Sequence, residues 1–143
     1  VDEIHGVRNT EDMVKLLSER YKGRRLIMYP DASGNSNKTS SSTTDHIMLK
    51  KIGAVKSPSK NGRVKDRVNT MNGMFCNSEG LRRYTVNTNK CPEYTDCLEQ
   101  QAYNAHGEPD KSKDNDHAND GSGYFIVRVF PLKRRFRELT IGS

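Results

Sequence analysis

The feature that most constrains this fold is one apolar run, RLIMY at residues 25–29, bounded by Gly23 and Pro30. Because both flanking residues interrupt regular structure, the run predicts a strand. A continuous apolar strand of this length is typical of an inner strand covered on both faces. Only 32% of the 143 residues are hydrophobic, so we expect one domain, residues 1–143, with a modest core and long solvated loops.

Periodicity and capping residues predict the other elements. Asn9 and Thr10 start a helix that ends at Gly23, and Thr44 and Asp45 start one that ends at Gly53. Because strands and helices alternate, an α/β domain with a partly parallel sheet is predicted. The remaining expectations are strands at 1–4, 54–57 and 81–86, helices at 64–75 and 91–103, an ambiguous segment at 116–130 and a basic tail at 131–143.

Asp31 directly follows the apolar strand and precedes a stretch rich in small polar residues. Ligands of parallel sheets bind beyond the carboxyl ends of strands, so Asp31 is a candidate metal-binding carboxylate. The alternative is an ordinary turn in which Asp31 accepts hydrogen bonds from nearby amides, and the local sequence favours this alternative. Lys38 follows in the loop and is a candidate phosphate contact, but the pattern of a phosphate-binding P-loop is absent.

A second acidic group, Asp116, His117 and Asp120, lies in the sequence DNDHANDG. On a helix, residues three and four apart share a face, so Asp120 would lie beside both Asp116 and His117. Carboxylates grouped in this way suit Mg²⁺ or Mn²⁺. The alternatives are a solvated acidic loop or a calcium-bound loop, although the spacing of a calcium loop is absent.

The net charge of +6 favours a polyanionic partner such as nucleic acid. The alternative is that the charge only keeps the protein soluble. Lys60, Arg63 and Lys65 are candidate DNA contacts within a basic region that also includes Arg67. The alternative is that these residues form solvated helix faces. His5, His46 and His106 are expected at the surface. The three cysteines form no zinc pattern, and no apolar run reaches the length needed to cross a membrane.

Taken together, LIMYPDASG and KDNDHAND resemble motifs of the C-terminal nuclease domain of the large terminase subunit, the DNA-packaging motor of tailed bacteriophages. The similarity is greatest to the short-tailed, headful-packaging type. The resemblance implies an RNase H-like fold, with a central mixed sheet flanked by helices, and a metal-dependent endonuclease that cuts concatemeric double-stranded DNA. It implies a two-metal site for Mg²⁺ or Mn²⁺. Asp31 matches the strand-end ligand, Asp120 the late-helix ligand, His117 a histidine one turn earlier, and Asp116 a neighbouring acid.

The sequence departs from the family pattern at two places. The family's first strand, with its catalytic acid, has no counterpart, and residues 1–4 match the third strand; the first two strands are therefore expected upstream. Neither Asp2 nor Glu3 is a replacement for that acid. Gly121-Ser122-Gly123 follows Asp120, where the family usually has alanine.

The resemblance further implies an ATPase domain, a small terminase subunit and a portal as partners, no membrane, and a location in the host cytoplasm rather than in the mature virion. We expect this chain alone to be weakly active or inactive. The competing hypothesis is a non-catalytic basic DNA-binding or docking module. The nuclease hypothesis requires Asp31 and Asp120 to converge, whereas the docking hypothesis predicts that they lie far apart.

Overall fold

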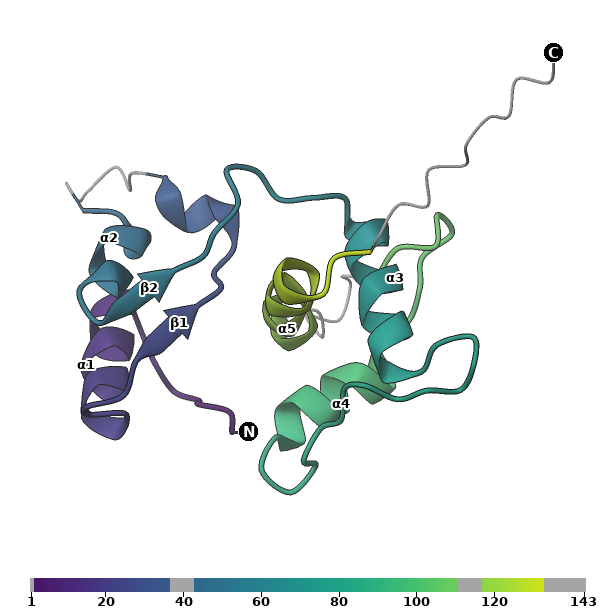
Figure 1. Cartoon of the computed structure of the whole chain (residues 1–143), viewed down its shortest axis with the longest axis horizontal. Helices are drawn as coiled ribbons and strands as arrows, with labels where there is room; N and C mark the ends of the chain where they lie inside the picture. Colours follow the sequence, from purple (N-terminus) through teal and green to yellow (C-terminus); the bar gives the residue numbers. More distant parts are fainter. Residues whose placement is uncertain (1, 37–42, 111–116, 133–143) are drawn as a thin grey trace, which may run out of the picture.

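The computed structural model describes residues 2–36, 43–110 and 117–132. Figure 1 shows one group of elements that contains the strands and a second group that is helical. The elements are α1 (Thr10–Arg20), β1 (Leu26–Met28), the 3-10 helix η1 (Ala32–Asn35), α2 (Asp45–Lys50), β2 (Gly53–Val55), α3 (Val64–Phe75), α4 (Pro92–Gln100) and α5 (His117–Val129). The described chain is therefore mostly helical, with a small α/β part.

The strand-containing group is a parallel pair, β1 and β2, joined through η1 and α2. Leu26 pairs with Gly53. A Cβ atom on Gly53 would lie 2.6 Å from the carbonyl oxygen of Leu26, so only glycine fits at this close approach of the two strands. α1 and α2 contact each other beside the pair. In the parts of the chain that the structure describes, no helix is long and apolar enough to span a membrane.

Capping explains where the helices begin. The Asn9 side chain accepts a hydrogen bond from the Asp12 amide at 2.8 Å, and Thr44 Oγ1 accepts one from the Ile47 amide at 3.2 Å. Each cap satisfies an amide that has no partner within its helix. Pro92 occupies the first turn of α4. These predicted helices are confirmed, although α4 ends at Gln100 rather than at residue 103.

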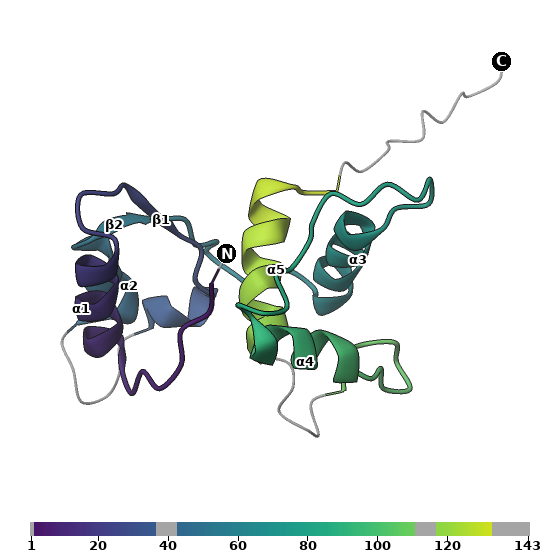
Figure 2. The same ribbon diagram turned by 90° about the horizontal axis from the view of Figure 1, so that it is seen from below.

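The helical group holds the core, and α5 contacts both α3 and α4 within it. In Figures 1 and 2, α5 lies between the strand-containing group and α3. Ile126 of α5 is fully buried and forms a cluster with Met71 and Met74 of α3. The ambiguous segment at 116–130 is thus helical from His117 onward despite its two glycines, because burial of Ile126 outweighs their low helix propensity.

Two predicted strands do not form, because their residues have other partners. Residues 2–4 are irregular, and the Glu3 carboxylate instead accepts hydrogen bonds from the first amides of α4, those of Glu93 and Tyr94, at 2.9 and 3.0 Å. Residues 81–86 form no strand; the amides of Arg83 and Tyr84 instead donate to the Met74 carbonyl at the end of α3.

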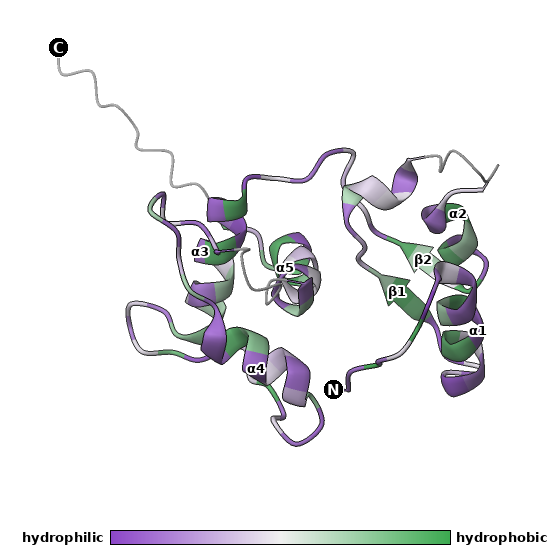
Figure 3. Cartoon of the chain, turned by 180° about the vertical axis from the view of Figure 1, so that it is seen from behind, coloured by the Kyte–Doolittle hydropathy of each residue, from purple (hydrophilic) through white to green (hydrophobic). Residues whose placement is uncertain are grey.

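The expectation of an inner strand covered on both faces is also wrong. Ile27 is 46% exposed, because β2 is the single neighbour of β1 within the described residues. Figure 3 shows hydrophobic residues along both strands. The basic tail lies almost wholly outside the described residues, which end at 132.

Substitution of Ile126 tests whether the contact of α3 with α5 holds the helical group together. We expect Ile126→Ala to lower the free energy of unfolding by about 3 kcal/mol, because it leaves a cavity in a closed core. Urea denaturation measures this loss. The matched control, Ile27→Ala, should cost less than about 1 kcal/mol because Ile27 is half exposed. Equal losses for the two variants would contradict this assignment of the core.

The Glu3 cap of α4 should make stability depend on pH. Burial alone would raise the pKa of Glu3, but hydrogen bonds from the Tyr94 and Glu93 amides and from His5 outweigh burial and lower it. A carboxylate with a lowered folded pKa stabilises the protein above its unfolded pKa, and this contribution is lost as pH falls through the folded value. The melting temperature of Glu3→Gln should therefore lie below that of the wild type at neutral pH and approach it below pH 4.5.

Glu99→Gln is the matched control, because Glu99 is exposed on the same helix. It should show no comparable convergence with the wild type. A constant difference between Glu3→Gln and the wild type across the acid range would show that Glu3 does not cap α4 as a carboxylate.

Candidate active site

The sequence-predicted residues Asp31, His117 and Asp120 line one cleft of about 600 Å³. Asp31 follows β1, and the other two come from the first turn of α5. The cleft is completed by the segment before α3 and by Arg67 and Tyr124. The structure thus places Asp31 and Asp120, which are far apart in the sequence, in the lining of one cleft.

An aromatic contact connects the end of β1 to α5. The rings of Tyr29 and Phe125 meet edge to face with centroids 5.3 Å apart. Asp31, two residues after Tyr29, accepts a hydrogen bond from the Tyr124 hydroxyl at 3.4 Å. Its other oxygen accepts one from the Ser33 amide at 2.5 Å. Asp31 is therefore both the cap of η1, as the turn interpretation predicted, and a wall of the cleft.

His46 holds the backbone at Asp31 in place. The side chain of His46 is buried, and its Nε2 lies 2.9 Å from the Asp31 carbonyl oxygen. A Cβ atom on Gly34 would lie 2.8 Å from the same nitrogen, which explains the glycine in PDASG. The prediction of a surface position is wrong for His46, because α2 turns it toward η1. His5 and His106 are exposed.

Hydrogen bonds in the cleft favour a charged Asp31, and burial favours a neutral Tyr124. Burial alone would raise the pKa of Asp31, but hydrogen bonds from Ser33 and Asn61 lower it below its usual value. Burial raises the pKa of Tyr124, and the Asp120 and Asp31 carboxylates add to this despite the nearby Arg67. Tyr124 therefore remains a hydroxyl donor and Asp31 a carboxylate acceptor at neutral pH.

Asp120 is held by Arg67, whose side chain is only 8% exposed. The guanidinium of Arg67 donates to Asp120 Oδ1 at 2.5 Å and lies over the Tyr124 ring, 4.9 Å from its centroid. The Arg67 stem crosses Gly123, where a Cβ atom would approach it to 2.6 Å. The sequence analysis placed Arg67 in a basic region open to phosphates; it is instead the buried partner of Asp120.

These residues can supply part of a metal site. In the described ranges, no group of three or more histidine, cysteine, aspartate or glutamate side chains could hold a metal ion. Asp116 lies outside those ranges. Mg²⁺ is commonly held by one or two carboxylates together with water and substrate phosphates, and Asp31 and Asp120 fit that requirement. Arg67 competes with a cation for Asp120.

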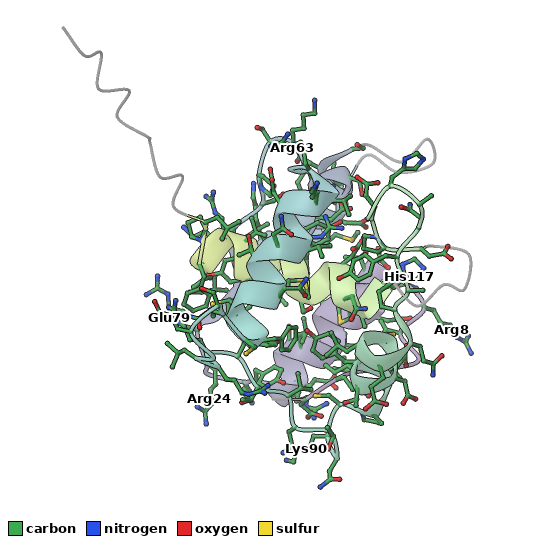
Figure 4. All side chains as sticks on the ribbon, turned by 90° about the vertical axis from the view of Figure 1, so that its right-hand side faces the viewer. Arg8, Arg24, Arg63, Glu79, Lys90 and His117 are labelled. Atoms are coloured by element: carbon green, nitrogen blue, oxygen red, sulfur yellow. The ribbon has the colours of Figure 1, made fainter. Side chains whose placement is uncertain are left out.

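The predicted DNA contacts alternate with residues that line the cleft. Lys60, Arg63 and Lys65 are exposed, whereas Asn61, Gly62 and Val64 line the cleft wall. Figure 4 shows Arg63 extending outward at the start of α3. Arg63 also pairs with Asp66, 3.1 Å away. Lys38 lies outside the described residues.

No known protein family, curated protein or solved structure matches the chain. The cysteines are free, with Cys76 exposed and Cys91 and Cys97 buried. Inference of function therefore depends on the geometry of the cleft and on the sequence motifs that line it.

Two glycines of α5 provide a matched test of the Arg67 placement. Gly121 faces open space, so Gly121→Ala should stabilise the helix by up to about 1 kcal/mol. Gly123→Ala should instead destabilise the protein by about 2 kcal/mol, because its Cβ would displace Arg67 and Met71. Urea denaturation of both variants measures these effects. Stabilisation by Gly123→Ala would mean that the Arg67 stem does not cross this glycine.

Proposed function

We propose that this chain is part of the nuclease domain of a bacteriophage large terminase subunit, with an RNase H-like fold. The activity is metal-dependent hydrolysis of phosphodiester bonds in concatemeric double-stranded DNA. The observation that supports the proposal is that Asp31 and Asp120, from a strand end and a late helix, line one cleft together with His117. This is the arrangement that the motif resemblance predicts.

Three residues that line the cleft, and several charged residues elsewhere in the sequence, have a role in the proposed chemistry. Asp31 and Asp120 would hold Mg²⁺ or Mn²⁺, with Asp116 as a neighbouring acid. The bound metal would activate water and stabilise the leaving oxygen. His117 would orient the attacking water. Lys60, Arg63 and Lys65, together with Lys38, would hold the DNA backbone, so cutting would not depend on base sequence.

Arg67 explains why the activity of this chain alone should be low. A cation that binds Asp120 competes with the positive charge of Arg67, which already forms a short ion pair with Asp120, and this competition would weaken metal binding. The resemblance also places a third acid on an upstream strand. In the described residues each strand has one unpaired edge that could receive such a strand. The proposed setting is the host cytoplasm, with an ATPase domain, small terminase subunit and portal as partners.

A non-catalytic DNA-binding or docking module is the second candidate. The Arg67–Asp120 pair favours it, because this pair neutralises Asp120 without a metal. In this alternative the exposed basic residues carry function and the acids are structural.

Titration with Mn²⁺, followed by electron paramagnetic resonance, separates the two candidates. We expect weak binding by the wild-type chain and at least a fivefold loss of affinity in Asp31→Asn, because a carboxylate ligand is removed while an acceptor for Ser33 remains. Asp96→Asn, an exposed acid on α4, is the matched control and should bind as the wild type does.

Cleavage of plasmid DNA is then assayed in Mg²⁺ and in Mn²⁺, with this chain and with a chain extended upstream. We expect cleavage by the extended chain and its loss in Asp31→Asn. Unchanged Mn²⁺ affinity in both Asp31→Asn and Asp120→Asn would overturn the nuclease proposal. Loss of DNA binding on charge reversal of Lys60 and Lys65, without any effect of the acids, would support the docking module.

A further inference from the structure

Asn61 is a cleft residue to which the proposed chemistry gives no role. It lies on the connection between β2 and α3, where its neighbours Lys60 and Gly62 are exposed and Asn61 itself is half-buried. Its side chain lines the cleft, as Asp31 does. Asn61 thus turns inward from an exposed stretch of chain, and this indicates that its amide has a partner at the cleft.

The two ends of the Asn61 amide contact two consecutive residues that follow β1. Asn61 Oδ1 accepts a hydrogen bond from the Ala32 backbone amide at 2.9 Å, and Asn61 Nδ2 donates to Asp31 Oδ2 at 3.4 Å. Because a backbone N–H can only donate, the oxygen of Asn61 must face Ala32, and this leaves the amide nitrogen facing Asp31. The backbone next to the carboxylate therefore determines how Asn61 is oriented.

We propose that Asn61 is a positioning residue for Asp31, because it holds the carboxylate in the orientation in which it binds a divalent cation. The inference rests on the proposed function and adds to it a residue that acts through a metal ligand. Metal ligands in proteins are commonly held by hydrogen bonds from surrounding residues, and loss of such a partner weakens metal binding by about 10- to 100-fold.

Asp31 depends on such partners because its place in the chain fixes only one of its oxygens. It lies at the start of η1, where the Ser33 amide donates to Asp31 Oδ1. Oδ2 accepts hydrogen bonds from other segments, from Asn61 before α3 and from the Tyr124 hydroxyl on α5. The direction of Oδ2 is therefore determined by contacts across the cleft.

Of these two donors, Asn61 offers the more specific test. Tyr124 also lies under the Arg67 guanidinium, so its replacement would disturb the ion pair with Asp120 as well. The hydrogen bonds of Asn61 go to the Asp31 side of the cleft. Substitution of Asn61 should accordingly change the carboxylate of Asp31 and leave that ion pair in place.

The test is titration of the whole chain with Mn²⁺, followed by electron paramagnetic resonance, with thermal melting of each variant. Asn61→Ala should weaken Mn²⁺ binding by about tenfold. Asn69→Ala, at an exposed position of α3 that does not line the cleft, is the matched control and should bind Mn²⁺ as the wild type does. A lower melting temperature of Asn61→Ala with unchanged Mn²⁺ affinity would overturn the proposal, because Asn61 would then only support the backbone of η1.

A double variant measures whether Asn61 acts through Asp31. Once Asp31→Asn has removed the carboxylate, adding Asn61→Ala should change Mn²⁺ affinity little, because both substitutions act on the same ligand. Losses that multiply in the double variant would contradict a role that passes through Asp31.

Asn61→Asp keeps an oxygen for the Ala32 amide and replaces the donor to Asp31 by a second carboxylate oxygen. Without metal, the two adjacent negative charges should lower the melting temperature. The 3.4 Å between the two groups suits one shared ion, because oxygens at right angles on an octahedral ion lie about 3 Å apart.

We therefore expect Asn61→Asp to bind Mn²⁺ at least about fivefold more tightly than the wild type, since it adds a charged ligand. Affinity no higher than that of Asn61→Ala would overturn the proposal, because residue 61 would then not face the ion that Asp31 binds.

These outcomes separate the positioning role from the proposed function. Mn²⁺ binding that is lost in Asp31→Asn but kept in Asn61→Ala would overturn the positioning role and leave the nuclease proposal standing. Unchanged binding in both Asp31→Asn and Asp120→Asn would overturn the nuclease proposal, and the positioning role with it.

Discussion

The ion pair between Arg67 and Asp120 connects α3 to α5 at the wall of the cleft. The Arg67 side chain is 8% exposed and the Asp120 side chain is 20% exposed. Removing such charges from water is costly, so the pair persists only with close geometry and further support. The glycine at 123 lets the Arg67 stem approach, and the Tyr124 ring covers the guanidinium. Both residues of the pair line the cleft.

The local elements of the fold could be predicted because local chemistry determines them. Caps at Asn9 and Thr44 start helices where the sequence predicts, and Pro92 begins α4. The prediction of strands was wrong where a residue has a partner far along the chain. Glu3 accepts a hydrogen bond from an amide of α4, 90 residues away, instead of pairing in a sheet. The glycines at 121 and 123 made the helix α5 hard to predict, because that helix depends on the packing of Gly123 and Ile126 against α3.

Asp31 and Asp120 could each be named from their motifs, but their convergence followed from a family resemblance rather than from spacing. The positions of two residues at the site could not be predicted from the sequence. In the sequence, Arg67 is one of many basic residues expected in solvent. Its burial beside Asp120 follows only from the contact of α3 with α5. The sequence predicts His46 at the surface, because the contact of its side chain with the backbone at the start of η1 has no local pattern. Both errors concern contacts between segments whose proximity no local pattern encodes.

We propose that Asp31 and Asp120 together hold a divalent cation and that Arg67 moves away from Asp120 when the cation binds. A crystal of the chain soaked in Mn²⁺ and measured by anomalous diffraction tests it most directly. The account predicts an anomalous peak within direct coordination distance of an oxygen of each carboxylate, with Arg67 moved away from Asp120. An intact Arg67–Asp120 pair with no peak in the cleft at saturating Mn²⁺ would contradict it.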